Sequence, residues 1–224
     1  MLARRLAGLL VGALALTAAC TAAPAPDRAA PSGTPPVADE PSPEPHTPLA
    51  VHALTSAELQ SRWWDWATSV AEERNPVTDQ DGHLCGQGQR DDVWFLAGTT
   101  GGAVTRSCNV PVGLPIAFPL VNLFGESSDC LEFMDSAQGS ATLDGRELTA
   151  EALGSTPIRM YPQEGNPFTS VEGSVNTHSC GLWVRLDPLD PGSHELTLRG
   201  RSGAFTTSVD YHLKVARPVP TNAA

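Results

Sequence analysis

The sequence has few basic residues, and this scarcity excludes a broad class of partners. Its 224 residues include 14 lysines and arginines against 25 acidic residues, which gives a formal net charge of −11. Such a surface repels phosphate backbones and anionic lipid headgroups. We therefore expect no nucleic-acid partner and no direct binding to headgroups.

The chain also lacks two signatures that decide the class of many proteins. The uncharged apolar run at residues 6–19 is shorter than the ~20 residues of a transmembrane helix. No Gly-x-Ser-x-Gly pentapeptide, the nucleophile elbow of many serine hydrolases, occurs in the sequence. We predict no catalytic residue and no cofactor.

The first twenty residues resemble a bacterial lipoprotein signal peptide. Arg4 and Arg5 supply a short cationic start, the apolar run follows, and Leu-Thr-Ala-Ala at 16–19 stands immediately before Cys20. Acylation of Cys20 would anchor the mature chain to the bacterial cell membrane on its extracytoplasmic side. We expect residues 1–19 to be removed, and cleaved secretion with a free Cys20 is the alternative.

A change of composition then divides the mature chain. Residues 21–50 contain nine prolines and no apolar cluster that could form a core, so 20–50 is predicted to be a disordered tether behind the lipidated cysteine. Residues 51–217 have the length of one domain. Residues 218–224 are predicted to be a disordered tail.

Four further cysteines predict two disulfides in an exported chain, with three possible connectivities. We favour Cys85–Cys108, which would tie the loop before a strand at 93–97 to the end of the following strand. The second pair would then be Cys130–Cys180, joining the middle of the chain to the C-terminal sheet.

Metal binding is the alternative for two of these cysteines. His83 precedes Cys85 with the same spacing as His178 precedes Cys180, and the four side chains could form one Cys/His site. Export favours disulfides, so we predict no metal. Residues 79–82, Asp-Gln-Asp-Gly, offer oxygen ligands for calcium but lack the rest of an EF-hand and are predicted to form a turn.

One helix and many short strands are predicted in the domain. Thr55 and Glu58 form a capping box, apolar residues follow at helical spacing, and Asn75-Pro76 is predicted to end the helix. A weaker pattern indicates a short helix at 130–134. Strands are predicted at 93–97 paired with 103–110, at 113–123 (edge or bulged), at an Asp144-Gly145 hairpin, at 157–161, at 181–187 paired with 193–199, and at 204–215. This spacing predicts an immunoglobulin-like β-sandwich with one N-terminal helix.

Several short motifs lie along the predicted domain: Trp63-Trp64-Asp65-Trp66-Ala67, Asn75-Pro76, Cys85-Gly86-Gln87-Gly88, Val93-Trp94-Phe95-Leu96-Ala97-Gly98, Arg106-Ser107-Cys108-Asn109-Val110-Pro111-Val112-Gly113, Pro191-Gly192-Ser193-His194-Glu195-Leu196 and Tyr211-His212-Leu213. Together they resemble a family of exported bacterial proteins that has no established activity. The resemblance spans about residues 55 to 215, and it implies a secreted β-rich domain.

Trp64 is the candidate ligand-binding residue. Trp63, Trp66 and Trp94 lie on apolar faces and are predicted to be core. Trp64 points away from the apolar face of its helix and could stack on a sugar; the alternative, which we favour, is partial burial by packing against the sandwich. We expect a monomeric, membrane-anchored lipoprotein with a non-catalytic binding or structural role, with a cell-envelope component or a glycan as candidate ligand. The alternative is a secreted carbohydrate-binding accessory module or a hydrolase.

Overall fold

The computed structural model describes residues 51–216. The predicted signal peptide at 1–19, the lipidation of Cys20, the tether and the tail lie outside the described residues. No helix within the described range is long and apolar enough to cross a bilayer.

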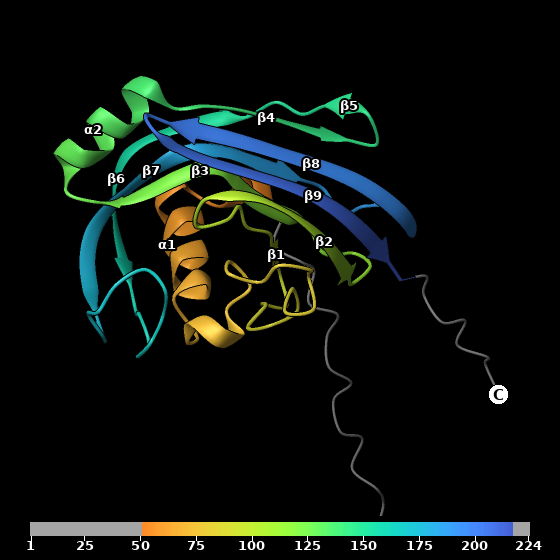
Figure 1. Ribbon diagram of the computed structural model, residues 1–224, viewed down its shortest axis with the longest axis horizontal. Helices are drawn as coiled ribbons and strands as arrows, with labels where there is room; N and C mark the ends of the chain where they lie inside the picture. Colours follow the sequence, from red (N-terminus) through yellow and green to blue (C-terminus); the bar gives the residue numbers. More distant parts are fainter. Residues whose placement is uncertain (1–50, 217–224) are drawn as a thin grey trace, which may run out of the picture. The chain divides into compact units, whose positions relative to one another are not determined.

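Two sheets pack face to face, so the predicted β-sandwich is confirmed (Figure 1). Most neighbouring strands are antiparallel, whereas β1 joins β3 and β2 joins β9 in parallel. The first sheet has the order β1 (Trp94–Phe95), β3 (Ile116–Gly125), β7 (Val175–Leu186) and β6 (Glu151–Met160). The second has the order β2 (Gly102–Val110), β9 (Phe205–Val215), β8 (Gly192–Ser202), β4 (Gln138–Leu143) and β5 (Arg146–Glu147).

Two predicted strand pairings are wrong. The sequence predicts that residues 93–97 pair with 103–110 and that 181–187 pair with 193–199. In the structure β1 and β2 lie in different sheets, and so do β7 and β8. The chain passes from one sheet to the other between these strands. The prediction failed because an alternating apolar pattern defines which face of a strand is buried but not which strand is its hydrogen-bonded partner.

The predicted hairpin and the predicted bulge are confirmed. Asp144 and Gly145 both adopt positive φ angles, of 50° and 77°, as a tight two-residue hairpin turn requires. The register of β3 against β7 shifts between Pro119 and Val121. On its other side β3 pairs with β1 only at residues 116–117, so most of that edge has no strand partner among the described residues.

The bulge in β3 brings Leu120 against the second sheet. A Cβ atom at Gly200 of β8 would lie 1.9 Å from the carbonyl oxygen of Leu120. A Cβ atom at Gly139 of β4 would lie 2.8 Å from the Leu120 Cβ. The close approach of the two sheets at this point therefore requires glycine.

Helix α1 (Ser56–Ala67) begins with the predicted capping box, in which Thr55 and Glu58 bond each other's backbone N–H groups. The predicted end at Asn75-Pro76 is wrong, because the helix ends at Ala67. Asn75 instead folds back and donates its side-chain amide to the carbonyl oxygens of Ala67 and Val70, at 2.7 and 3.1 Å. The asparagine thus caps the helix from outside it.

A second helix departs from the prediction of a single N-terminal one. Helix α2 (Ser127–Ser136) includes the residues 130–134 for which the sequence indicates a short helix, and it packs against β3, β6 and β7 (Figure 1). Two short 3-10 helices, η1 (Val51–Ala53) and η2 (Glu72–Arg74), flank α1.

The apolar residues form two clusters. One lies between the sheets and includes Phe118, Leu198 and Tyr211. The other lies between α1 and the first sheet and includes Trp63 and Trp183, whose rings meet edge to face with centroids 5.9 Å apart. Burial of the predicted core tryptophans at 63, 66 and 94 is confirmed.

Both favoured disulfides, Cys85–Cys108 and Cys130–Cys180, are confirmed, with Cα atoms 5.7 Å apart in each pair. Disulfides of this kind form and persist in oxidising compartments. The domain is therefore adapted to an extracytoplasmic, non-reducing environment.

Candidate functional site

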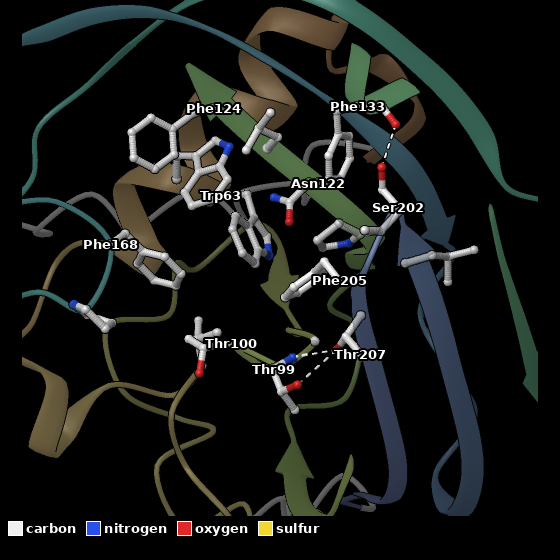
Figure 2. A pocket seen from close by; sticks show the side chains of 18 residues that line it. Trp63, Thr99, Thr100, Asn122, Phe124, Phe133, Phe168, Ser202, Phe205 and Thr207 are labelled. Atoms are coloured by element: carbon white, nitrogen blue, oxygen red, sulfur yellow. Dashed lines mark hydrogen bonds between the residues drawn. The ribbon is translucent and has the colours of Figure 1, made fainter. Parts of the chain in front are cut away.

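A cavity of about 550 Å³ opens where β1 leaves the edge of β3 uncovered. Its volume lies within the range of small-molecule sites. Figure 2 shows aromatic side chains around it from α1, β3, α2, the loop after β6, and β9. We call it the aromatic cavity, after the rings of Trp63, Trp64, Phe124, Phe133, Phe168 and Phe205.

The two tryptophans present apolar surface to the cavity because their N–H groups are already engaged. The Nε1 of Trp63 donates to the carbonyl oxygen of Leu96 at 2.9 Å. The Nε1 of Trp64 donates to the Oγ of Ser179 at 2.9 Å. These bonds hold both indoles in position without using any polar group of a ligand.

Trp64 belongs to this site as a buried wall, which agrees with the packing that the sequence favours and not with an exposed sugar platform. Only 4 % of its surface is exposed. Its ring packs edge-on against Phe124 and Phe168, with centroids 4.7 and 5.4 Å away. Phe168 comes from the loop after β6, which covers the helix face that the sequence pattern leaves open.

Most polar side chains in the wall have partners within the protein. The hydroxyl of Thr207 accepts the Thr99 backbone N–H at 2.7 Å and lies 3.2 Å from the Thr99 hydroxyl. The Ser202 hydroxyl donates to the Phe133 carbonyl at 2.7 Å. These bonds connect β8, β9, α2 and the loop after β1, and they fix the shape of the wall.

Asn122 is different. It projects from β3 between the aromatic rings in Figure 2, and its Nδ2 is hidden from solvent without a hydrogen-bond partner among the described residues. A buried amide without a partner is costly, since it loses its bonds to water. The amide of Asn122 is thus a polar group available for a molecule in the aromatic cavity.

A buried arginine holds two backbone segments that line the cavity. The guanidinium of Arg106, 1 % exposed, donates to the carbonyl oxygens of Val77 and Gly98, at 2.8 and 2.9 Å. It also donates to the hydroxyl of Tyr211 at 3.0 Å. Several carbonyl dipoles compensate the charge, so this arginine organises the loops and does not face the ligand.

The described residues that line the aromatic cavity include no acid, base or thiol. Its lining residues are aromatic, aliphatic, glycine, proline, threonine, serine and asparagine, with no ionisable side chain among them. The arrangement therefore suits binding, because general acid–base catalysis needs a titratable group within reach of the substrate.

The alternative of a Cys/His metal site is excluded for this pair of motifs. Cys85 and Cys180 are held in different disulfides and offer no thiolate. His83 instead bonds the carboxylate of Asp81 through Nδ1 at 2.6 Å, and this bond raises the pKa of His83. The carboxylate of Asp79 accepts the backbone N–H groups of Asp81 and Leu84, at 3.3 and 2.8 Å, and so stabilises the bend at residues 80–82.

Another histidine forms a surface clasp. The Nδ1 of His194 lies 2.8 Å from the Asp144 carboxylate, and its Nε2 lies 2.8 Å from the Asp190 carbonyl. The bond to Asp144 raises the pKa of His194, and the same bond lowers the pKa of Asp144. Both ring nitrogens are occupied, so the clasp ties the hairpin turn to β8.

A groove of about 710 Å³ runs along α1 and β6. Most of its lining side chains are polar or charged, and several already have hydrogen-bond partners within the protein. Arg62 donates to the Asp92 carboxylate, Arg159 donates to the Asn176 side chain, and Glu58 accepts the backbone N–H of Thr55. No hydrogen-bonded Ser, His and Asp side chains form a triad within residues 51–216. The aromatic cavity is therefore the stronger candidate for a site.

Sequence reasoning missed Asn122 and the phenylalanines of the wall. The signal available for Asn122 was its position as a lone amide within the apolar stretch Val121-Asn122-Leu123. The phenylalanines come from segments far apart in the chain, so only the fold brings them together.

No family model and no curated protein matches the chain. Among solved structures, the solution structure of Amebosin is 14% identical to this chain and has a TM-score of 0.21, and the match covers 54% of this chain and 95% of the Amebosin chain. The structure of PbICP-C in complex with falcipain-2 is 11% identical and has a TM-score of 0.26, and the match covers 54% of this chain and 98% of that one. The cysteine protease inhibitor EhICP2 from Entamoeba histolytica is 11% identical and covers 54% and 94%, with a TM-score of 0.25. These scores are too low for an argument about fold or function.

Proposed function

We propose that this protein is an extracytoplasmic lipoprotein that binds a small molecule in the aromatic cavity without catalysing a reaction on it. The observation that carries the proposal is the cavity itself. It has about 550 Å³ of space, six aromatic rings in its walls and an amide without a partner. Ligand sites typically combine mainly apolar walls with a few well-placed polar groups.

The anchor is the second part of the proposal. The signal-like residues before Cys20 support acylation at that cysteine, and the two disulfides support export. A lipid at Cys20, followed by a proline-rich tether, would hold the domain near the membrane as a monomer. The ligand would then be met outside the cytoplasm.

The alternatives receive less support. A glycan-binding platform needs an exposed aromatic face, and Trp64 is buried. A hydrolase needs a base beside its nucleophile, and the described residues that line the aromatic cavity offer serine and threonine hydroxyls but no base. Binding is the function that these walls serve best.

The test is a thermal-shift screen of the full chain with neutral single-ring aromatics. A ligand present at 100 times its Kd stabilises the folded state by about 2.7 kcal/mol, which raises the Tm of a domain of this size by ~5–11 °C. The variant Thr100→Trp places an indole at the mouth of the cavity and should abolish the shift. The control Thr206→Trp, exposed on β9 outside the cavity, should preserve it. Equal shifts in both variants would disprove binding in the cavity.

A further inference from the structure

We infer that the aromatic cavity selects a flat molecule that carries a hydrogen-bonding group and no negative charge, and that this group pairs with the amide of Asn122. The inference rests on the proposed function, because it requires the cavity to hold a ligand. It adds the chemical class of that ligand, which three properties of the wall define.

The first property is the absence of charge. Among the described residues no ionisable side chain lines the cavity. The buried guanidinium of Arg106 uses its hydrogen bonds on carbonyl oxygens and on Tyr211. A carboxylate ligand would therefore give up its hydration without gaining a partner of opposite charge, and the faces of the aromatic rings attract cations and not anions. The site should therefore reject negatively charged molecules.

The second property is the Nδ2 of Asn122, the one buried side-chain polar atom of the lining that has no partner among the described residues. The hydroxyls of Ser202, Thr99 and Thr207 bond within the protein. A sugar would bring several hydroxyls to walls that are mainly aromatic and aliphatic, and each hydroxyl left without a partner would carry a desolvation cost. An amide offers both a donor and an acceptor, so one hydroxyl or carbonyl group on the ligand satisfies it.

The third property is the shape of the walls. Figure 2 shows Trp63, Phe124, Phe133 and Phe205 arranged around Asn122, with Phe168 beside them. Aromatic rings pair best edge-on or in offset stacks with other rings. A flat ring entering between these side chains would meet such contacts on several sides while its polar group faces Asn122.

The experiment compares 4-methylphenol with toluene, which differ only by the hydroxyl group. Titrations of the full chain, followed by NMR of the indole and amide N–H groups, give the ratio of the two Kd values. In Asn122→Leu that ratio should shift against 4-methylphenol by about tenfold, because its hydroxyl loses the amide partner. In the control Asn109→Leu, the same substitution at an exposed site on β2, the ratio should stay at the wild-type value.

The outcomes separate the two proposals. If neither probe binds in the cavity, the proposed function fails and this inference fails with it. If both bind there and the ratio is the same in wild type and in Asn122→Leu, only the selection by Asn122 is overturned. Should Asn122→Leu not fold, Asn122→Ala gives the same comparison. In the wild type, 4-methylbenzoate should bind at least about tenfold more weakly than 4-methylphenol, and equal affinities would refute the exclusion of negatively charged ligands.

Discussion

Gly200→Ala tests the close approach of the two sheets that shapes the cavity wall. The new methyl group would lie 1.9 Å from the carbonyl oxygen of Leu120 and 3.1 Å from the Cβ of Val121. The first neighbour is backbone and cannot rotate away, so β3 must move. Overpacking of a core costs up to about 3 kcal/mol, and here we expect the upper end of that range. For a domain of this size, such a loss lowers the Tm by ~6–12 °C.

Gly154→Ala is the matched control. Gly154 also lies in a strand, its backbone is not in the left-handed region, and a Cβ there would meet nothing within 4 Å. The substitution should be neutral or should stabilise the fold by ~0.4–1 kcal/mol, because alanine restricts the unfolded chain. Urea and thermal unfolding, followed by circular dichroism under oxidising conditions, measure both effects. Similar unfolding curves for the two variants would refute the argument that the sheets touch at Leu120.

Three further outcomes are expected. The two disulfides close loops of 23 and 50 residues, and on the chain-entropy model their reduction should remove up to ~3.4 and ~4.1 kcal/mol of stability. A chelator should leave the Tm unchanged. An unchanged Tm after verified reduction would contradict this prediction. Cys20→Ser should yield an unacylated chain that partitions into the aqueous phase, and mass spectrometry that finds no lipid on the wild-type chain would contradict the anchor. The clasp of His194 and Asp144 should stabilise the fold between the two unfolded-state pKa values, at about pH 4 to 6.5. The raised pKa of His194 means that its contribution is lost as pH rises through that pKa, and the lowered pKa of Asp144 means that its contribution is lost at low pH. At this surface site the loss of stability in His194→Gln should be below about 1 kcal/mol. That loss should shrink from pH 6 to pH 8, and a loss that grows over this range would contradict the stabilising role of the protonated His194.

Local chemistry was sufficient for the features that depend on a few neighbouring residues. The capping box at Thr55 and the turn at Asp144-Gly145 formed as predicted, because their hydrogen bonds and φ angles are properties of short segments. Both disulfides were also predicted correctly, since four cysteines allow only three pairings and the favoured pairing joined a loop to a neighbouring predicted strand.

Features that depend on distant segments could not be predicted in the same way. The sequence favoured packing for Trp64 but could not name its partners, because Phe168 lies in a loop about a hundred residues away. Helix α1 ends at Ala67, and Asn75, eight residues further along the chain, donates its side-chain amide to the carbonyl oxygen of Ala67. A local helical pattern does not show such a contact. Strand partners differed because an alternating pattern fits either sheet of a sandwich.

The candidate site is the extreme case of this dependence. Its rings extend from Trp63 to Phe205, so no local window of the sequence contains them together. Asn122 gave a faint local signal as an amide in an apolar strand. Its meaning required knowing that β1 is only two residues long and leaves the β3 edge uncovered.

The most direct test of the ligand site is a crystal structure of the protein with 4-bromophenol, whose bromine is located by its anomalous scattering. Binding in the aromatic cavity predicts a bromine peak between the rings of Trp63, Phe124 and Phe205, with the phenol oxygen within hydrogen-bond distance of the Asn122 amide. An empty cavity at saturating 4-bromophenol, or a bromine peak only elsewhere on the protein, would contradict the account.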